Sequence, residues 1–500
     1  MKKHKTLGQV YTPQWVVNEI LDLIGYNSEE ILDKYILEPS CGDGVFLEEI
    51  VKRYINISIK KGLNKDIIIN NLEKYIWGIE IDEIEYDKCI FNLNEVIKLN
   101  LETDLTVNWN ISNENTLFAY NNKFSYFDFI VGNPPYIRIH NLDIETRNIL
   151  KTEFLFSEGT IDIYLSFFEM GIKMLKASGK LGFITPNSYL HNSSYSKFRE
   201  FLKNNRLVEI LIDFKANKIF KGFSTYTAIT ILNKSSKNDY FEYKELEKEN
   251  IISINKINYK SLNSKDWSFS DAKDADFINN LEKDKNGFIK DYFDVQYGFA
   301  TLRDKIFISN ITENNHETVV FNGHLIEKGI LKKIVKGSKY KGDVNTIEYI
   351  IFPYYLDKKR YKPICENDLS NTYPLAFKYL LLNKEELIKR DLDKGAMWYE
   401  FGRSQGIQSI HKEKIVLSTL VNGAIRHFKL PADIFVYSGI FITKNNLHSN
   451  WDLIEKTLNS DEFYRFIRIT GKDFSGGYKS ITSKQIKEFK INTPIINKLF

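Results

Sequence analysis

Short apolar segments alternate with longer amphipathic segments through the first 235 residues, and this alternation constrains the fold more than any other feature. The apolar segments predict β-strands at 35–40, 75–82, 127–132, 181–186, 208–214 and 227–233, with a weaker one at 105–112. Between them, residues 45–62, 85–100 and 161–177 carry apolar side chains at helical spacing. Such alternation is typical of a mostly parallel, doubly wound sheet with helices on both faces, so the sequence predicts an α/β domain.

The residue composition and the strand–helix pattern of the sequence change after residue 234. Residues 233–250 (NKSSKNDYFEYKELEKEN) are polar and charged, which predicts a linker or a surface hairpin. Beyond them the strand–helix rhythm fades into short strands, aromatic clusters and turns, which are typical of an α+β domain. We therefore expect two domains, residues 1–240 and residues 241–500.

The net charge of +4 is unevenly distributed along the 500 residues. The charge is −3 over residues 1–240, −4 over 241–330 and +11 over 331–500. A basic C-terminal part favours an anionic partner such as nucleic acid, although lysine-rich chains also scatter such charge over a solvated surface.

The tetrapeptide Asn133-Pro134-Pro135-Tyr136 directly follows the predicted buried strand 127–132. Two prolines make a rigid, extended turn, because proline fixes its own φ and restricts the residue before it. Such a turn can aim the Asn133 side-chain carbonyl and the Pro134 backbone carbonyl at one planar amino group, while Tyr136 offers a flat face to a heterocycle. The alternative interpretation is a turn that only ends the strand, with Asn133 as a structural cap.

A second turn, Glu38-Pro39-Ser40-Cys41-Gly42-Asp43-Gly44, lies between a predicted strand and a predicted helix. Its glycines allow a cofactor to approach the backbone, yet the spacing is neither GxGxxG nor a phosphate-binding P-loop. A nucleoside cofactor without phosphates fits this turn better. Glu80 ends the next strand, where a carboxylate can accept hydrogen bonds from a ribose diol.

Several classes of protein are disfavoured. The three cysteines are widely spaced, and the eight histidines show no HExxH or paired spacing, so we expect neither a disulfide framework nor a metal site. The N-terminus lacks the apolar region of a signal peptide, and no stretch of about 18 apolar residues occurs. These features predict a cytoplasmic protein.

In their order along the chain, these motifs resemble the gamma-class N6-adenine DNA methyltransferases, which include modification methylases of type II restriction systems. The matching segments cover about half the chain: TLGQVYTP (6–13), EPSCGDGVFL (38–47), GIEID (78–82), IVGNPPY (130–136), GKLGFITPNSYL (179–190) and IFKGFSTYTAITIL (219–232). The resemblance implies a Rossmann-like, S-adenosylmethionine-dependent catalytic domain followed by a target-recognition domain.

The resemblance also implies roles for individual residues. The cofactor S-adenosylmethionine would be bound by Tyr11, Thr12, Pro13, Glu38, Pro39, Ser40, Gly42, Glu80, Ile81, Asn115 and Asn133. Asn115 departs from the family, which usually has an aspartate there, although an amide oxygen also accepts a hydrogen bond. The target adenine would be held by Asn133, Pro134 and Tyr136, with Phe220 on its other face; Phe223 or Tyr226 are alternatives to Phe220.

DNA contacts are expected in the second domain, where basic and aromatic residues interleave. The candidates for these contacts are Lys336, Lys339, Tyr340, Trp398, Tyr399, Arg403, Ser404, Gln405, Tyr478 and Lys479. The expected reaction needs the adenine to leave the base stack, and it needs neither a metal nor a covalent intermediate.

Other functions remain open at this point. The NPPY motif also serves planar amides, so a protein glutamine methyltransferase is an alternative, as is a non-enzymatic DNA-specificity module. The cofactor motif begins at Gly8, so we expect no preceding nuclease domain; a companion restriction endonuclease would then be a separate chain. The triplet Glu242-Tyr243-Lys244 resembles a nuclease motif, but it is isolated in the expected linker.

Overall fold

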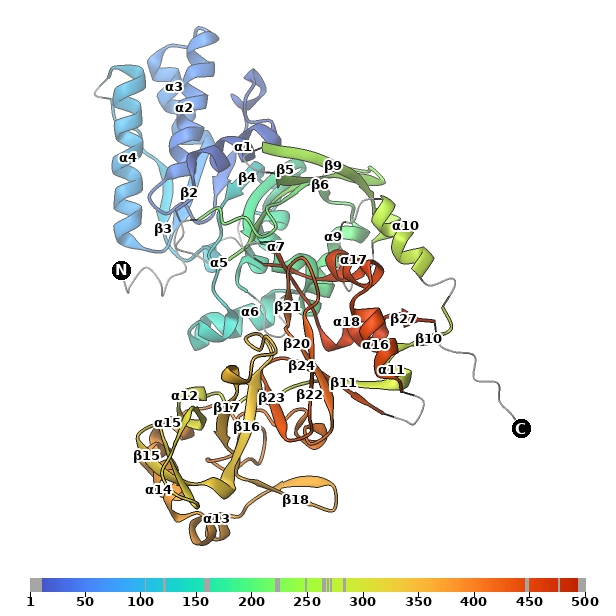
Figure 1. Cartoon of the computed structure of the whole chain (residues 1–500). Coiled ribbons are helices and arrows are strands. Elements are labelled where there is room, and N and C mark those ends of the chain that lie inside the picture. The colour runs from blue at the N-terminus through green and yellow to red at the C-terminus, as the bar shows by residue number, and fades with distance from the viewer. Residues whose placement is uncertain are drawn as a thin grey trace. The chain divides into compact units, whose positions relative to one another are not determined.

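The computed structural model divides the chain into two compact units, residues 1–271 and 272–500 (Figure 1). The residues that the structure describes are 11–103, 105–119, 123–156, 162–220, 225–247, 250–262, 267, 269, 272–281, 285–445, 449–474 and 477–492.

The first unit is built around a nine-stranded sheet with the order β3-β2-β1-β4-β5-β7-β6-β8-β9. The strands are β1 Ile36–Glu38, β2 Ile76–Glu80, β3 Asn110–Asn113, β4 Phe127–Gly132, β5 Leu175–Pro186, β6 Val208–Asp213, β7 Thr227–Asn233, β8 Tyr240–Glu247 and β9 Asn250–Asn258. Neighbours from β3 to β5 are parallel, whereas β7 runs antiparallel to both β5 and β6. The predicted α/β sheet is thus confirmed as a mixed parallel and antiparallel one.

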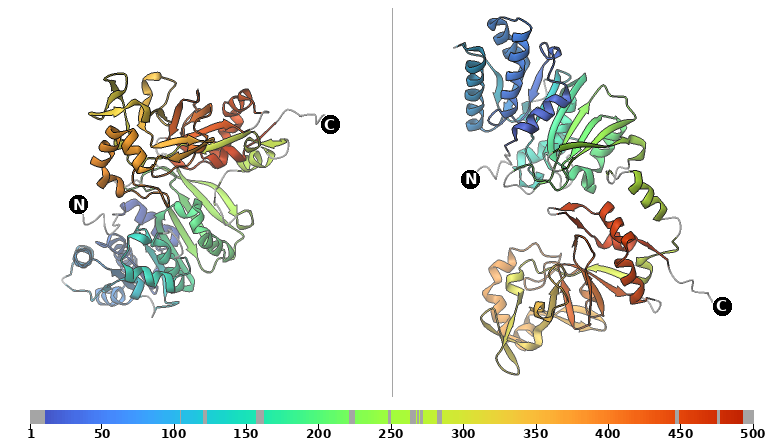
Figure 2. Two further views of the ribbon diagram at one scale, coloured as in Figure 1. Left: turned by 90° about the horizontal axis from the view of Figure 1, so that it is seen from below. Right: turned by 45° about the horizontal axis from the view of Figure 1, so that its top comes forward.

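Helices cover both faces of this sheet (Figures 1 and 2). They are α1 Gln14–Ile24, α2 Val45–Lys60, α3 Lys65–Tyr75, α4 Glu83–Leu101, α5 Thr116–Ala119, α6 Ile144–Glu153, α7 Tyr164–Met174, α8 Ser188–His191 and α9 Ser196–Asn204. Successive strand residues point to opposite faces; Ile130 packs with α6, α7 and α9, whereas Val131 packs with α1 to α4. Both faces therefore carry a hydrophobic core.

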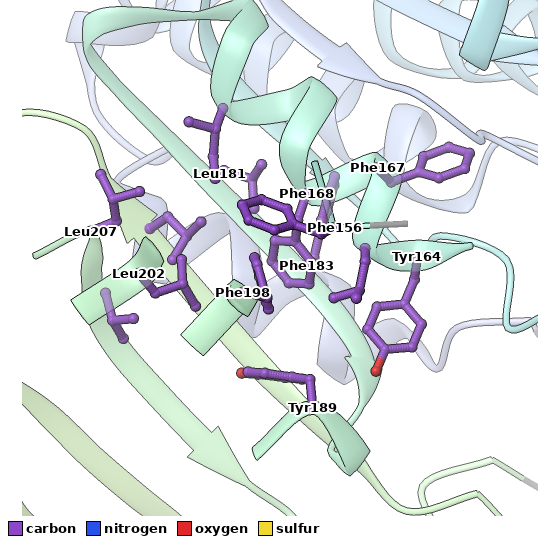
Figure 3. Close-up of a cluster of buried hydrophobic side chains, with 14 of the residues drawn as sticks. Phe156, Tyr164, Phe167, Phe168, Leu181, Phe183, Tyr189, Phe198, Leu202 and Leu207 are labelled. Atoms are coloured by element: carbon purple, nitrogen blue, oxygen red, sulfur yellow. The ribbon is translucent and has the colours of Figure 1, made fainter. Parts of the chain in front are cut away.

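The core beneath α7 and α9 is rich in aromatic side chains (Figure 3). The Phe168 ring lies 5.3 Å from that of Phe183 on β5 and 5.2 Å from that of Phe198 on α9. These apolar contacts hold α7 against the middle of the sheet. The strand β4, which carries the Asn-Pro-Pro-Tyr turn, is one neighbour of β5.

The expected domain boundary at residue 240 is wrong. Residues 240–258 form the hairpin β8–β9, and β8 pairs in parallel with β6. Trp267 is 1% exposed and stacks on Phe241 of β8. The segment expected to be a linker is therefore the edge of the first sheet, and the division falls after residue 271. Glu242 and Lys244 lie on β8 itself.

The second unit is an assembly of small sheets and short helices. Its strands are β10 Gly287–Phe288, β11 Phe293–Tyr297, β12 Ile308–Ser309, β13 Ile311–Glu313, β14 Thr318–Phe321, β15 His324–Glu327, β16 Leu331–Lys336, β17 Glu348–Ile351, β18 Tyr354–Asp357, β19 Arg360–Pro363, β20 Lys414–Leu417, β21 Leu420–Val421, β22 His427–Leu430, β23 Ile434–Tyr437, β24 Ile440–Lys444, β25 Asp473–Phe474, β26 Tyr478–Ser480 and β27 Lys490–Ile491. Its helices are α10 Ala272–Leu281, α11 Ile289–Tyr292, α12 Asp304–Phe307, α13 Glu366–Thr372, α14 Pro374–Leu382, α15 Lys384–Ile388, α16 Trp451–Leu458, α17 Asp461–Thr470 and α18 Ser483–Glu488.

Two hydrophobic cores stabilise the second unit. One lies between the sheet β12-β17-β16-β23 and helices α13 to α15. The other lies between the sheet β11-β24-β20-β22 and helices α16 to α18, which gather beside that sheet (Figure 2).

Candidate active site

A cavity of 340 Å³ opens in the first unit where β1, β2, β3 and β4 end. Parallel strands present their carboxyl ends at one edge of a sheet, which is why residues far apart in sequence meet there. The cavity is lined by Tyr11, Thr12, Glu38, Pro39, Ser40, Cys41, Gly42, Asp43, Val45, Glu80, Ile81, Glu85, Asn115, Thr116, Leu117, Asn133, Pro135, Ile137, Asn141, Leu142, Asp143, Thr146, Ile163 and Phe167.

The turn after β1 forms one wall of the cavity. The Cys41 amide donates to the Ile79 carbonyl at 3.0 Å, which ties the turn to β2. Gly42 has φ +54°, and a Cβ there would meet no atom of the described residues within 4 Å, which leaves room for a ligand beside it. Gly44 has φ +96°, and a Cβ there would come within 2.8 Å of the Cys89 Sγ. Gly42 thus serves the cavity and Gly44 serves the packing of α4.

Glu38 brings a buried carboxyl group to this wall. Glu38 is 2% exposed, and burial raises the pKa of its carboxyl group well above the ordinary value of 4.5. Within the described part of the chain, its Oε2 atom has no hydrogen-bond partner. A buried acceptor without a donor is costly, so this position favours a cationic or hydrogen-bonding ligand.

Glu80 lies at the end of β2 and is fixed by the backbone. Its Oε2 accepts a hydrogen bond from the Gly42 amide at 2.8 Å, and its Oε1 accepts one from the Asp82 amide at 2.8 Å. Each carboxylate oxygen keeps a further lone pair for a ligand hydroxyl. Burial raises the pKa of Glu80, and the two backbone amides oppose that rise.

Asn115 and Thr116 close the next side of the cavity, after β3. The Asn115 Oδ1 accepts from the Leu117 amide at 3.1 Å, and the Thr116 hydroxyl donates to the Pro39 carbonyl at 2.5 Å. The second bond links the α5 segment to the turn after β1, so the two walls support each other.

The Asn-Pro-Pro-Tyr turn leaves β4 beside the cavity. Gly132 precedes it with φ +152°, a conformation that favours glycine. The Asn133 Nδ2 donates to the Thr12 Oγ1 at 3.1 Å, and the Ser40 hydroxyl approaches the Asn133 backbone carbonyl at 3.5 Å. These contacts join the turn to the segment before α1 and to the turn after β1.

Tyr136 lies against Phe220 next to this turn. The ring centroids are 6.3 Å apart at an interplanar angle of 69°, an edge-to-face contact. The Tyr136 hydroxyl donates to the Ile184 carbonyl at 3.2 Å, and Phe220 is 4% exposed. Of the two alternatives to Phe220, Phe223 lies outside the described residues. Tyr226 directly precedes β7, and its carbonyl accepts a hydrogen bond from the Asn187 amide.

The cavity brings together most of the cofactor residues predicted from the sequence, with Pro13 as the exception. Pro13 is instead the N-cap residue directly before α1, and its carbonyl accepts from the Val16 and Val17 amides. Sequence reasoning gave no role to Glu85, Asp143 and Phe167, which also line the cavity. Glu85 could have been predicted to face the cavity, because it lies in the first turn of the helix after Glu80. Asp143 and Phe167 belong to no recognisable motif.

The predicted DNA-contacting residues of the second unit are used partly inside the fold. Tyr399 is 1% exposed and its hydroxyl donates to the Ile364 carbonyl at 2.8 Å, so this side chain lies in the core of the unit. Trp398 is half-buried and its indole donates to the Glu366 carboxylate at 3.3 Å.

Arg403 and its neighbours organise the loop before β20. The Arg403 guanidinium pairs with Asp391 at 2.5 Å, and the Ser404 amide and hydroxyl both donate to Asp393. Gln405 donates to the Gly298 carbonyl at 3.4 Å.

The remaining candidates are more accessible. Lys339 is exposed, and Tyr340 packs edge-on against Phe428 at 5.3 Å. Lys336 lies 3.9 Å from Asp304. Tyr478, 44% exposed, and Lys479 lie on β26.

Two negative findings concern the described residues alone. Among them, no group of three or more histidine, cysteine, aspartate or glutamate side chains is arranged to hold a metal ion. None of the helices assigned in that part of the chain is both long enough and apolar enough to cross a membrane.

The chain is similar to several known proteins. Residues 48–220 match the family model described as "Eco57I restriction-modification methylase". The chain is 26% identical to the type II restriction enzyme and methyltransferase RM.Eco57I of Escherichia coli, over 95% of this chain and 56% of that protein. It is 31% identical to the type II methyltransferase M.BstVI of Geobacillus stearothermophilus, over 45% of this chain and 42% of that protein.

The chain is similar to type II restriction-modification methyltransferases. The resemblance inferred from the motifs is thereby confirmed. The chain spans about half the length of the curated relatives that it matches. Its fold is also that of the type IIL restriction-modification enzyme MmeI, solved in complex with DNA: the TM-score is 0.66 at 14% identity, over 98% of this chain and 68% of that one.

Proposed function

We propose that this chain is a site-specific DNA methyltransferase that transfers a methyl group from S-adenosylmethionine to N6 of an adenine in double-stranded DNA. The observation that carries the proposal is that Asn133 and Pro135, from the turn after β4, line the same cavity as residues 38–43 of the turn after β1. The similarity to type II methyltransferases supports the same reaction class. On this reading the first sheet is a doubly wound, Rossmann-like methyltransferase fold.

The cavity residues fit S-adenosylmethionine. The cofactor carries a positive ammonium group, a sulfonium, a ribose diol and an adenine, and carries no phosphate. The buried Glu38 Oε2 lacks a donor within the described part of the chain, and the Glu80 oxygens keep free lone pairs. Several carboxyl groups, among them Asp43 and Glu85, give the cavity wall a negative character that suits a cation.

Residues of the chain would hold each part of the cofactor. Glu38 would accept from the ammonium group, Glu80 would accept from the ribose hydroxyls, and Ile81 with Asn115 would border the adenine. The bound cofactor supplies an electrophilic methyl group. Leu117 and Phe167 give the cavity an apolar side that excludes water.

The target adenine would be held by the turn after β4. Asn133 Oδ1 and the Pro134 carbonyl would accept hydrogen bonds from the adenine amino group, which leaves its nitrogen lone pair available for the methyl group. Rate would come from positioning and from the exclusion of water, with no covalent intermediate.

Base flipping is required, because N6 of a stacked adenine cannot reach a buried methyl group. The flipped base would stack on Tyr136, with Phe220 beside its other face. The rings now touch edge to face at 6.3 Å, so the base must separate or rotate them as it enters. Stacking on an aromatic side chain contributes about 1–3 kcal/mol and offsets the cost of extrusion.

Residues 272–500 would recognise the target sequence, and a restriction endonuclease is the partner to expect. The basic charge of residues 331–500 supports contact with phosphates. Accessible residues such as Lys339, Tyr478 and Lys479 are better placed for this role than the buried Tyr399.

Single-molecule sequencing of DNA from cells that express the chain tests the proposal, because it reports the modified base and its sequence context together. The expected result is N6-methyladenine at one defined motif in cells with the wild-type chain, and none in cells with Asn133→Ala. Modified cytosine, or no modification despite soluble, cofactor-binding protein, would refute it.

A further inference from the structure

The Asn133 side chain is held by a residue 121 positions earlier in the sequence. Its Nδ2 donates to the Thr12 Oγ1 at 3.1 Å. A side-chain amide has its donor and its acceptor on separate arms, so a partner on the nitrogen arm fixes the direction of the oxygen arm as well.

Both partners of this hydrogen bond stand on rigid supports. Thr12 is 7% exposed and directly precedes Pro13 and α1. The helix α1 is anchored on β5, where a Cβ at Gly182 would come within 2.7 Å of Ile20. Asn133 follows β4, which is paired on both sides in the sheet. The hydrogen bond therefore joins two residues that each lie within two positions of a well-packed element.

We propose that Thr12 is a positioning residue for methyl transfer, acting through Asn133, and this inference rests on the proposed function. The Thr12 hydroxyl holds the Asn133 amide so that its oxygen meets the amino group of the entering base. The resemblance to gamma-class enzymes implies a different role for Thr12, a contact with the methionine part of the cofactor. The two roles predict different losses when the hydroxyl is removed.

A positioning role predicts a slower transfer step. Displacement of a reacting group by a fraction of an ångström slows the chemical step, because the reacting atoms are then in the productive alignment less often. Cofactor affinity should be nearly unchanged, because the carboxyl groups of Glu38 and Glu80, which would bind the ammonium group and the ribose, are left in place. A cofactor-contact role predicts the opposite: weaker cofactor binding, with a nearly normal rate once the cofactor saturates the protein.

The experiment compares Thr12→Val, which keeps the shape and removes the hydroxyl, with Thr12→Ser, which keeps the hydroxyl. Thr12→Ala is a second hydroxyl-free variant in case valine disturbs folding. Thr116→Val is the matched control, because its hydroxyl bonds the Pro39 carbonyl on the cofactor side of the same cavity. For each protein, calorimetry gives the Kd for S-adenosylmethionine, and single-turnover methylation of duplex DNA at saturating cofactor gives the transfer rate constant.

We expect Thr12→Val and Thr12→Ala to lower the transfer rate constant about 10-fold or more, with a cofactor Kd within about threefold of wild type and with Thr12→Ser close to wild type. Thr116→Val should mainly raise the Kd. The inference is overturned if Thr12→Val raises the Kd without slowing transfer, if transfer is unchanged, or if Thr12→Ser is as slow as Thr12→Val.

A crystal structure of Thr12→Val separates failure of this inference from failure of the proposed function. The inference predicts that the Asn133 amide turns away from its wild-type direction, whichever substrate the protein uses. An unmoved Asn133 amide would contradict the inference, whereas a wild-type protein that binds the cofactor and never methylates DNA would contradict only the proposed function.

Discussion

The two units of this chain use their chemically active side chains differently. In the first unit, residues 12, 38, 80, 115 and 133 come from five separate segments and line one cavity. In the second unit, several of the residues best suited to contact DNA serve the fold instead: Tyr399 lies in the core, and Arg403 is paired with Asp391.

The difference follows from what fixes a side chain in each unit. A residue at the carboxyl end of a parallel strand is placed by the backbone, because hydrogen-bond register aligns the strand ends. A residue on a surface loop is placed by its partners, and nearby aspartates compete with DNA for an arginine. A motif is therefore a stronger predictor in the first unit than in the second.

Asn133→Ala should have the largest effect. Removing the side-chain acceptor should lower methyl transfer by about 100- to 1,000-fold, a loss comparable to that of a transition-state hydrogen bond. Cofactor binding should be nearly unchanged, because Glu38 and Glu80 remain. Rate constants and calorimetric Kd values on the same preparation check this, and an equal loss of both would place Asn133 on the cofactor side.

Substitutions of Tyr136 should come next. Tyr136→Ala removes the stacking face, worth about 1–3 kcal/mol, whereas Tyr136→Phe removes only the hydroxyl bond to the Ile184 carbonyl. Steady-state assays with duplex DNA should show a much larger loss for alanine. Stacking would not explain this tyrosine if the two variants behaved alike.

Glu38→Gln should weaken cofactor binding about 10-fold or more, because a hydrogen bond to a charged group contributes about 1.5–3 kcal/mol. The same variant should change the pH dependence of stability. Burial raises the pKa of Glu38 in the folded protein, so the folded state binds more protons and the cofactor-free wild type loses stability as the pH rises above the ordinary value of 4.5.

Glutamine does not titrate, so the decline in the thermal unfolding temperature of Glu38→Gln should be shallower over the same pH range. Saturating S-adenosylmethionine should narrow the difference, because its ammonium group stabilises the ionised carboxylate of the wild type. Identical pH profiles for the two cofactor-free proteins would show that Glu38 is not the group responsible.

Substitutions in the second unit should have the smallest effects. Arg403→Ala removes a largely exposed ion pair worth about 0–1 kcal/mol, and we expect unchanged sequence specificity. Lys339→Ala is the comparison, because Lys339 is exposed and has no acidic partner among the described residues. It should weaken DNA binding equally for all sequences and lower the salt slope by about 1.

Filter-binding titrations at several salt concentrations, with matched and mismatched duplexes, distinguish these cases. Relaxed specificity at one base pair in Arg403→Ala would mean that the arginine leaves Asp391 to contact a base. Motifs would then predict side-chain roles in the second unit as well as they do in the first.

Much of the first unit could be predicted from its sequence. The strands at 36–38, 76–80, 127–132, 208–213 and 227–233 lie where apolar runs predicted them, because a buried strand must be apolar along its length. The boundary at 240 could not be predicted. The polar hairpin β8–β9 packs on the sheet edge chiefly through Phe241 and Tyr243. The residues between and around them are polar, and for that reason the segment was predicted to be a linker or a surface hairpin.

The site was predictable where residues lie within a motif. Glu38, Glu80 and Asn133 belong to such segments, and all three line the cavity. Asp143, the N-cap of α6, and Phe167 of α7 reach the same cavity from segments that carry no recognisable motif. The bond between Thr12 and Asn133 spans 121 residues, and nothing local in the sequence indicates it.

Transfer of a labelled methyl group tests the central claim most directly. Purified protein is incubated with isotopically labelled S-adenosylmethionine and plasmid DNA, with Asn133→Ala in parallel. The DNA is then digested to nucleosides and the protein to peptides, and mass spectrometry identifies the labelled products. The account predicts label on N6-methyladenine with the wild type and almost none with the variant. Label on cytosine, label on glutamine residues of protein, or equal labelling of adenine by both proteins would contradict it.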